Sequence, residues 1–346
     1  MMRGVSCKLH LSGLRRSEVT FLGQGMRWHA TASVLRTAAL HDASGCAQEP
    51  GLWSPRRVGH PAAFDASPRF SELPHLQDAR MQAALGLSLS AGRPLRARRL
   101  NSATAATVFP SETDAYHRLA RSLAARTAMD AKELVEAVEF FGKVRRRIRR
   151  HTVVDLAAGH GLAGLLFAAF EPTVHRVLLL DQRRPLSFTN VLAAVCEVAP
   201  WVSDKVSYLT ADITTVLTTS DPPPNEPADT RAARDYLRML PPGTAGFVAV
   251  HACGSLTDTC LSIATRARGP VAVLPCCFTG TARDAPAGLR RVLGVSMAAD
   301  VHRAYCLESD GYSVDFSAIP ACVTPLNRVL VAVRRREESH AVSPER

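Results

Sequence analysis

A short glycine-rich segment has the residue types and spacing to bind a nucleotide. An apolar run ends in Asp155, and Ala157, Gly159 and Gly161 follow at alternate positions before a second apolar run over 165–170. This order predicts a strand, a tight turn and a buried helix. Glycines in such a turn let backbone N–H groups approach a nucleotide closely, because no Cβ stands in the way.

Two further acids follow apolar runs. The run over 177–180 ends in Asp181, where a carboxylate can accept hydrogen bonds from both ribose hydroxyls, and Asp212 follows the next run. Gly159, Gly161 and Gly164 also satisfy the spacing G-x-G-x-x-G, so NAD is an alternative ligand. The acid at 155 argues against NAD, because a dinucleotide site does not call for one there.

The spacing Asp155-x-Ala157-x-Gly159-x-Gly161 resembles the first motif of class I S-adenosylmethionine (SAM) methyltransferases, in which three alternating glycines follow an acid. Alanine replaces the first glycine, and we expect it to be tolerated in a turn with φ below zero. The resemblance implies that SAM is the cofactor and that Asp181 binds its ribose. The cofactor-binding residues that it implies are Asp155, Ala157, Gly159, Gly161, Asp181 and Asp212.

Two motifs in the second half narrow the resemblance. His251-Ala-Cys-Gly-x-x-Thr-Asp and Pro275-Cys-Cys-Phe-x-Gly are together similar to one methyltransferase-like group. It includes the methyltransferase domain of the glutathione S-transferase C-terminal-domain-containing protein. A related pattern occurs in a tRNA ribose 2′-O-methyltransferase whose zinc-binding front end has no counterpart in this sequence. The resemblance covers roughly residues 150–334 and implies a Rossmann-like α/β fold. We expect a seven-stranded, mostly parallel sheet with helices on both faces and an N-terminal helical extension.

His251 is the candidate catalytic residue. It follows an apolar run at a predicted strand end, where its imidazole can orient a substrate hydroxyl or amine or take its proton. The alternative is a histidine that hydrogen-bonds neighbouring loops. Cys253, Cys276 and Cys277 lie in the same two motifs, but neither C-x-x-C nor H-x₃₋₅-H spacing is present, so no metal site is predicted.

The charge is uneven along the 346 residues. The net charge is +11, and residues 1–150 carry 24 Lys and Arg against 12 Asp and Glu, while the remainder carries 18 against 19. A run within 143–150 is either a solvated helix end or a phosphate-binding patch for RNA. Its cations are Lys143, Arg145, Arg146, Arg147, Arg149 and Arg150.

The domain organisation is predicted from these patterns. Residues 1–41 hold six basic residues and one acid, which is typical of a mitochondrial presequence. We expect a basic linker over 42–110, helices over 111–150, the methyltransferase domain over 151–336 and a charged tail over 337–346. No apolar run is long enough to cross a membrane.

The expected function is a SAM-dependent methyltransferase that acts on RNA, either tRNA or rRNA, in an organelle. The alternative is a methyltransferase-like RNA-binding or ribosome-assembly factor that transfers no methyl group.

Overall fold

The structure, a computed structural model, describes part of the chain. The described residues are 79–85, 87, 89–90, 93–94, 98–216, 225–278, 284–320, 323–324 and 326–335. The chain divides into two units, residues 1–45 and 46–346, and every described residue belongs to the second. The predicted presequence and the charged tail lie outside the described residues, as does most of the predicted linker.

Seven strands form the central sheet, and they are confirmed close to where the apolar runs predicted them. They are β3 (Thr152–Leu156), β4 (Arg176–Asp181), β5 (Val206–Thr210), β6 (Ala245–Val250), β7 (Val271–Leu274), β8 (Tyr312–Ala318) and β9 (Arg328–Arg334). A separate two-stranded sheet pairs β1 (Leu89–Ser90) with β2 (Arg93–Pro94).

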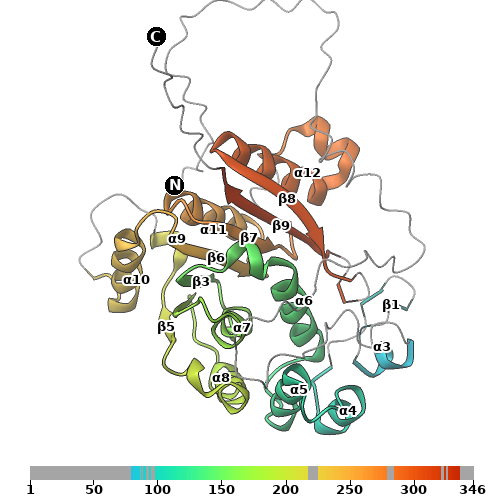
Figure 1. The fold of residues 1–346 in the computed structure, drawn as a ribbon. Helices are drawn as coiled ribbons and strands as arrows, with labels where there is room; N and C mark the ends of the chain where they lie inside the picture. Colours follow the sequence, from blue (N-terminus) through green and yellow to red (C-terminus); the bar gives the residue numbers. More distant parts are fainter. Residues whose placement is uncertain are drawn as a thin grey trace, which may run out of the picture. The chain divides into compact units, whose positions relative to one another are not determined.

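The order in the large sheet is β5-β4-β3-β6-β7-β9-β8 (Figure 1). β3 to β7 pair in parallel, whereas β9 pairs antiparallel to both β7 and β8. The order reverses beside β3, which lies between β4 and β6, and ligands of open α/β sheets bind at such a switch point outside the carboxyl ends of the strands. The predicted seven-stranded, mostly parallel sheet is confirmed.

Helices cover both faces of the sheet. The helices are α3 (Ala79–Leu85), α4 (Ser102–Val108), α5 (Ala115–Ala125), α6 (Ala131–Ile148), α7 (Leu162–Phe170), α8 (Ser187–Val198), a 3₁₀ turn η3 (Pro200–Val202), α9 (Ile213–Val216), α10 (Ala228–Met239), α11 (Ser255–Arg266) and α12 (Ala287–Ser309). α4 to α8 share one hydrophobic core with one face of the sheet, and α9 to α12 share a second core with the other face. Alternate residues of β3 show the division, since Val153 enters the first core and Val154 the second. No described helix has the length and apolar character to cross a membrane.

The core begins earlier in the chain than the sequence predicted. Leu100, Ala105 and Phe109, which fall in the predicted linker, are fully buried in the same cluster as α5, α6 and the sheet. The sequence did not predict this packing, because the apolar residues of this segment show no sustained helical or strand period. The helices over 111–150, predicted as an N-terminal helical extension, pack into the same core.

α6 extends from the carboxyl ends of the parallel strands, where Glu136 contacts His251, to their amino ends. It ends at Ile148, and three residues separate it from β3, so its basic end lies where the parallel strands start. There Arg145 and Arg149 both pair with the buried Glu171, and Arg147 pairs with Asp315 at 2.6 Å. Arg150 donates to the carbonyl oxygens of Arg147 and Arg149. These contacts hold part of the predicted RNA patch within the fold, and its binding to RNA stays a prediction.

One buried acid of α6 gives a pH-dependent prediction. Glu139 is 5% exposed, and its Oε1 has no hydrogen-bond partner among the described residues. Burial raises its pKa from 4.5 to about 7, against the lowering effect of Lys143. The unfolded chain therefore loses this proton first as pH rises, so stability falls between these two values, by at most about 3 kcal/mol.

We expect Glu139→Gln to raise the free energy of unfolding at about pH 8 and to change it little at about pH 5. Thermal or urea unfolding at both pH values measures the difference. The control is Glu112→Gln, because Glu112 has an 83% exposed side chain and should give no pH-dependent gain. An equal effect of Glu139→Gln at both pH values would contradict the assignment.

Candidate functional site

The glycine-rich turn lies at the carboxyl end of β3 and has an unusual backbone. Ala157, Gly159 and Gly161 have φ values of 57°, 53° and 78°, and Gly161 is the N-cap of α7. A Cβ on Gly161 would lie 2.7 Å from Leu179, whereas a Cβ on Gly159 would meet no atom within 4 Å. Gly161 is thus required for packing, and Gly159 borders open space in which a ligand can lie.

The expectation for Ala157 was wrong. We expected its turn to have φ below zero, but the residue adopts the left-handed region, in which a Cβ approaches the following carbonyl oxygen. The turn fixes this backbone through two hydrogen bonds of the next residue, since the Ala158 N–H donates to the Leu180 oxygen and the Gly161 N–H donates to the Ala158 oxygen. The alanine therefore carries strain that the family's usual glycine would not.

Asp155 lies beneath the turn. It is 1% exposed, and its Oδ2 accepts a hydrogen bond of 2.8 Å from the N–H of Gly164 in the first turn of α7. Burial raises its pKa to about 7, the Gly164 hydrogen bond opposes this rise, and the charge of Asp181 adds to it. Its described contact thus joins β3 to α7 and supports the turn from below.

Asp181 ends β4 beside the turn, as predicted. Its Oδ2 accepts from the N–H of Gly159 at 2.9 Å, and its Oδ1 accepts from the N–H of Arg183 at 3.0 Å. A carboxylate offers about four acceptor positions, so two remain for ligand hydroxyls. The side chain holds the turn and can still bind a ribose.

Tyr208 on β5 is a residue of the site that the sequence did not predict. Its hydroxyl lies 2.9 Å from the Gly159 oxygen and 3.2 Å from the Arg183 oxygen, so it links the turn to the loop after β4. Its ring packs against Phe188 and lies 5.6 Å from the Arg184 guanidinium. A single tyrosine in a strand gives no sequence signal for this role.

Asp212 begins α9. Its Oδ1 accepts from the N–H of Thr214 at 2.9 Å and from the Thr214 hydroxyl at 2.7 Å, which makes it a helix cap. Its Oδ2 lies 3.4 Å from the side-chain nitrogen of Gln182, in the loop that also holds Arg183. It is half-buried and lies near Asp181 through this loop, and its role in cofactor binding stays a prediction.

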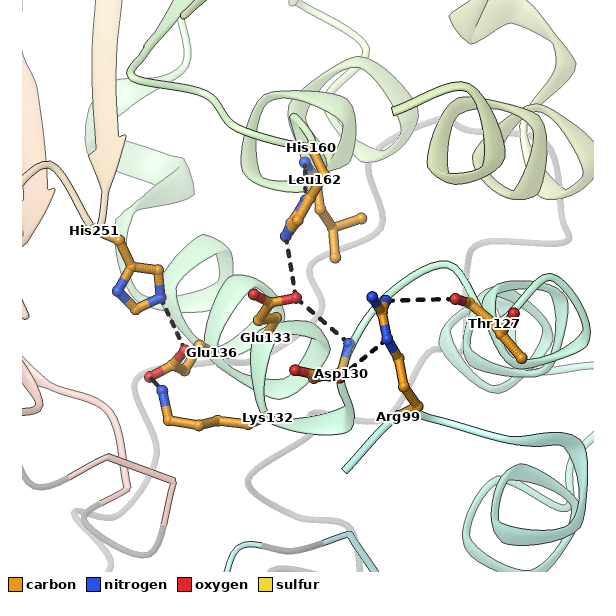
Figure 2. A network of polar contacts seen from close by, with 9 residues as sticks. All are labelled: Arg99, Thr127, Asp130, Lys132, Glu133, Glu136, His160, Leu162 and His251. Carbon is orange, nitrogen blue, oxygen red and sulfur yellow. Dashed lines mark hydrogen bonds and ion pairs between the residues drawn. The ribbon is translucent and has the colours of Figure 1, made fainter. Parts of the chain in front are cut away.

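His251 lies after β6, beside the turn. β6 pairs with β3 such that Asp155 faces Val248, so both strands deliver their next residues to the same edge. His251 has a φ of 65°, a left-handed conformation that is uncommon outside glycine and is typical of functional sites. Its Nε2 lies 2.9 Å from Oε2 of Glu136 (Figure 2).

Glu136 comes from α6 and is fully buried. Burial raises its pKa, but the hydrogen bond and charge of His251 and the charge of Lys132 outweigh this effect, so the pKa lies below its ordinary value. Lys132 bonds to Oε1 while His251 bonds to Oε2. A carboxylate at this position makes Nε2 of neutral His251 the protonated nitrogen and leaves Nδ1 as the basic one.

A second histidine of the site also faces α6. Nδ1 of His160, inside the glycine turn, accepts from the N–H of Leu162 at 3.3 Å, and its Nε2 lies 3.7 Å from Glu133 (Figure 2). Burial lowers the pKa of His160, Glu133 raises it, and His251 lowers it again. α6 therefore brings Glu133 and Glu136 to the two loops that form the edge of the site. The sequence predicted this helix only as part of an N-terminal extension, without a role in the site.

The cysteines of the two second-half motifs come together, as their neighbouring strands imply. The sulfur atoms of Cys253, Cys276 and Cys277 all lie within 4.8 Å of one another. Cys253 and Cys276 are half-buried, and Cys277 is exposed.

The site fits a nucleoside cofactor. Open space borders Gly159, spare acceptor positions remain on Asp181, and a histidine held by a carboxylate lies at the end of the next strand. The strand order together with this turn defines the protein as a Rossmann-like α/β protein of the class I methyltransferase fold.

Comparisons with known proteins found similar chains among solved structures. No protein-family model matches the chain, and no curated protein matches it. The chain is similar to the B. subtilis tRNA methyltransferase TrmK at 12% identity and a TM-score of 0.32, over 56% of this chain and 64% of TrmK. It thus spans less than two thirds of TrmK.

Two further solved structures are similar over comparable lengths. The fibrillarin pre-rRNA processing protein of Methanococcus jannaschii has 12% identity and a TM-score of 0.33, over 54% of this chain and 68% of that one. The methyltransferase domain of bacterial CtHen1 has 12% identity and a TM-score of 0.35, over 58% of this chain and 99% of that one. These likenesses concern the fold alone.

The strained turn gives a stability prediction. We expect Ala157→Gly to raise the free energy of unfolding by about 0.5–1 kcal/mol, because relief of the left-handed Cβ exceeds the added freedom of the unfolded chain. The matched control is Ala168→Gly inside α7, which should lower it by about 1 kcal/mol. Urea unfolding measures both, and a loss of stability in Ala157→Gly would contradict the strain.

Proposed function

We propose that the protein is a SAM-dependent methyltransferase in which His251 accepts the proton of the methyl acceptor and Glu136 positions His251. The observation that carries the proposal is the hydrogen bond between the buried Glu136 and His251, beside a nucleotide-binding turn. The fold and the spare acceptor positions of Asp181 support the cofactor. SAM, when bound, supplies an activated methyl group and leaves as a neutral thioether.

The chain's own residues have three tasks in this proposal. The turn and Asp181 hold the nucleoside, with Asp155 and Tyr208 fixing the turn from below and from the side. Nδ1 of His251 takes the proton from an acceptor hydroxyl or amine, and the resulting imidazolium is stabilised by the Glu136 carboxylate. α6 fixes this carboxylate through Lys132.

Asp155 favours SAM over NAD within the proposal, because a dinucleotide site does not call for an acid at the end of the first strand.

RNA in an organelle is the acceptor class that we propose, on the basis of the basic N-terminal half of the sequence. α6 has 18 residues, so its basic end and its site end are roughly 25 Å apart. An acceptor that contacts both ends has to be a macromolecule. The alternative is an RNA-binding or assembly factor without activity, and the binding experiment below distinguishes it.

The cofactor assignment predicts the effect of one substitution. We expect SAM to bind the full chain and Asp181→Asn to weaken binding at least about ten-fold, because the neutral amide retains only one acceptor oxygen. Isothermal titration with SAM, and separately with NAD, measures both affinities. Asp204→Asn, on the exposed loop before β5, is the matched control and should bind normally. Binding of NAD in place of SAM, or of neither, would contradict the proposal.

The base assignment predicts the effect of Glu136→Gln. Lys132 bonds to one oxygen of Glu136 and should keep the amide oxygen, so that the amide nitrogen faces Nε2 of His251. The amide then donates to Nε2, Nδ1 carries the proton, and the base is blocked. We expect kcat for transfer of labelled methyl groups to RNA to fall about 10²–10⁴-fold, with the affinity for SAM unchanged.

Glu133→Gln is the control for this variant. It lies on the same helix and faces His160, so it should leave kcat within a few-fold of the unmodified protein. An equal loss in both variants would indicate that α6 only supports the fold. Label transfer to protein in place of RNA would contradict the acceptor class and leave the base assignment standing.

A further inference from the structure

We propose that Cys253, Cys276 and Cys277 form a thiolate site for a soft divalent cation, Zn²⁺ being the one that the ligand set favours. Three sulfur atoms lie within 4.8 Å of one another, and those of Cys276 and Cys277 are 3.7 Å apart. A tetrahedral zinc ion with bonds of about 2.3 Å places its sulfur ligands about 3.8 Å from one another. Small side-chain shifts therefore suffice to form the site.

Two loops fixed by the fold bring the sulfurs together. The Gly254 N–H donates to the Cys277 oxygen at 3.1 Å, and the His251 N–H donates to the Leu274 oxygen at 3.0 Å, so the segments after β6 and β7 are joined directly. The cluster therefore lies in two loops that follow adjacent parallel strands and are joined to each other by backbone hydrogen bonds.

A buried arginine holds both loops from the other side. Arg303 of α12 is 4% exposed, pairs with Asp258 and donates to the Gly254 oxygen at 3.0 Å. Its guanidinium also lies 5.7 Å from the ring of Phe278, the residue after Cys277, and that of Arg328 lies 5.9 Å from the same ring. The cysteine positions are thus held by contacts that do not involve the thiols.

The chemistry of the cluster suits a cation. A cation that binds here displaces the thiol protons and gains up to three thiolate ligands. Three protein ligands leave a fourth tetrahedral position, and the exposure of Cys277 gives water access to it.

Cobalt titration of the full chain tests the site. Reduced protein, freed of metal by a chelator, is titrated with Co²⁺, which gives a near-ultraviolet sulfur-to-cobalt band when thiolates bind it. We expect the band to saturate at one cobalt per chain and to disappear on addition of Zn²⁺. Absence of a sulfur-to-cobalt band in the unmodified protein overturns the proposal.

Serine variants identify the ligands. Cys253→Ser, Cys276→Ser and Cys277→Ser should each weaken metal binding by more than the roughly 10–100-fold that loss of an outer-shell contact costs. Cys196→Ser and Cys306→Ser replace described cysteines that lie outside the cluster and should bind metal normally. Normal binding by the three cluster variants overturns the proposal.

Proton release gives a second readout that does not depend on the band. Zinc binding to the unmodified protein should release up to three protons, and each cluster variant should release one fewer. The thermal melting of each variant without metal shows whether it folds. Neither readout requires methyl transfer, so the outcome is independent of the proposed function.

Discussion

A buried carboxylate, Glu136, connects the first helices of the core to the site. A charge without solvent access is costly unless it is paired and hydrogen-bonded, and its partners are Lys132 on its own helix and His251 after β6. The position of α6 and the orientation of His251 are therefore set together. A shift of α6 or a rotation of His251 would break the contact between Glu136 and His251 and leave the buried carboxylate with Lys132 as its remaining described partner.

The parallel pairing of β3 with β4 and β6 brings the other groups to the same edge. Each of these strands ends in a turn that departs from ordinary backbone or carries an acid: the glycine turn, Asp181 and His251. Backbone strain at Ala157 and His251 is tolerated because hydrogen bonds and buried packing hold both loops. The site combines a rigid sheet with strained loops, an arrangement that suits the alignment of a donor and an acceptor.

The residues at the carboxyl ends of the parallel strands differ in chemistry between the β4 side and the β7 side of the site. On the β4 side, acceptor groups around Gly159 and Asp181 suit a nucleoside. On the β7 side, the thiols of Cys253, Cys276 and Cys277 lie together in the loops after β6 and β7. A cation held there would lie beside the proposed acceptor side of the site, two residues along the chain from the proposed base.

The sequence by itself determined the strands, the glycine turn and the place of Asp181 and His251, because apolar runs that end in polar residues reflect burial followed by exposure at a strand end. It did not determine that α6 belongs to the site. Glu133 and Glu136 are 27 and 115 residues from the histidines that they face, and no local pattern connects them. The sequence also did not predict the positive φ of Ala157, because alanine is common in turns with negative φ. The three cysteines meet through the pairing of β6 with β7 and not through a spacing along the chain, so the sequence indicated their proximity only through the fold that the motifs imply, and the tertiary structure decided how close the sulfurs lie.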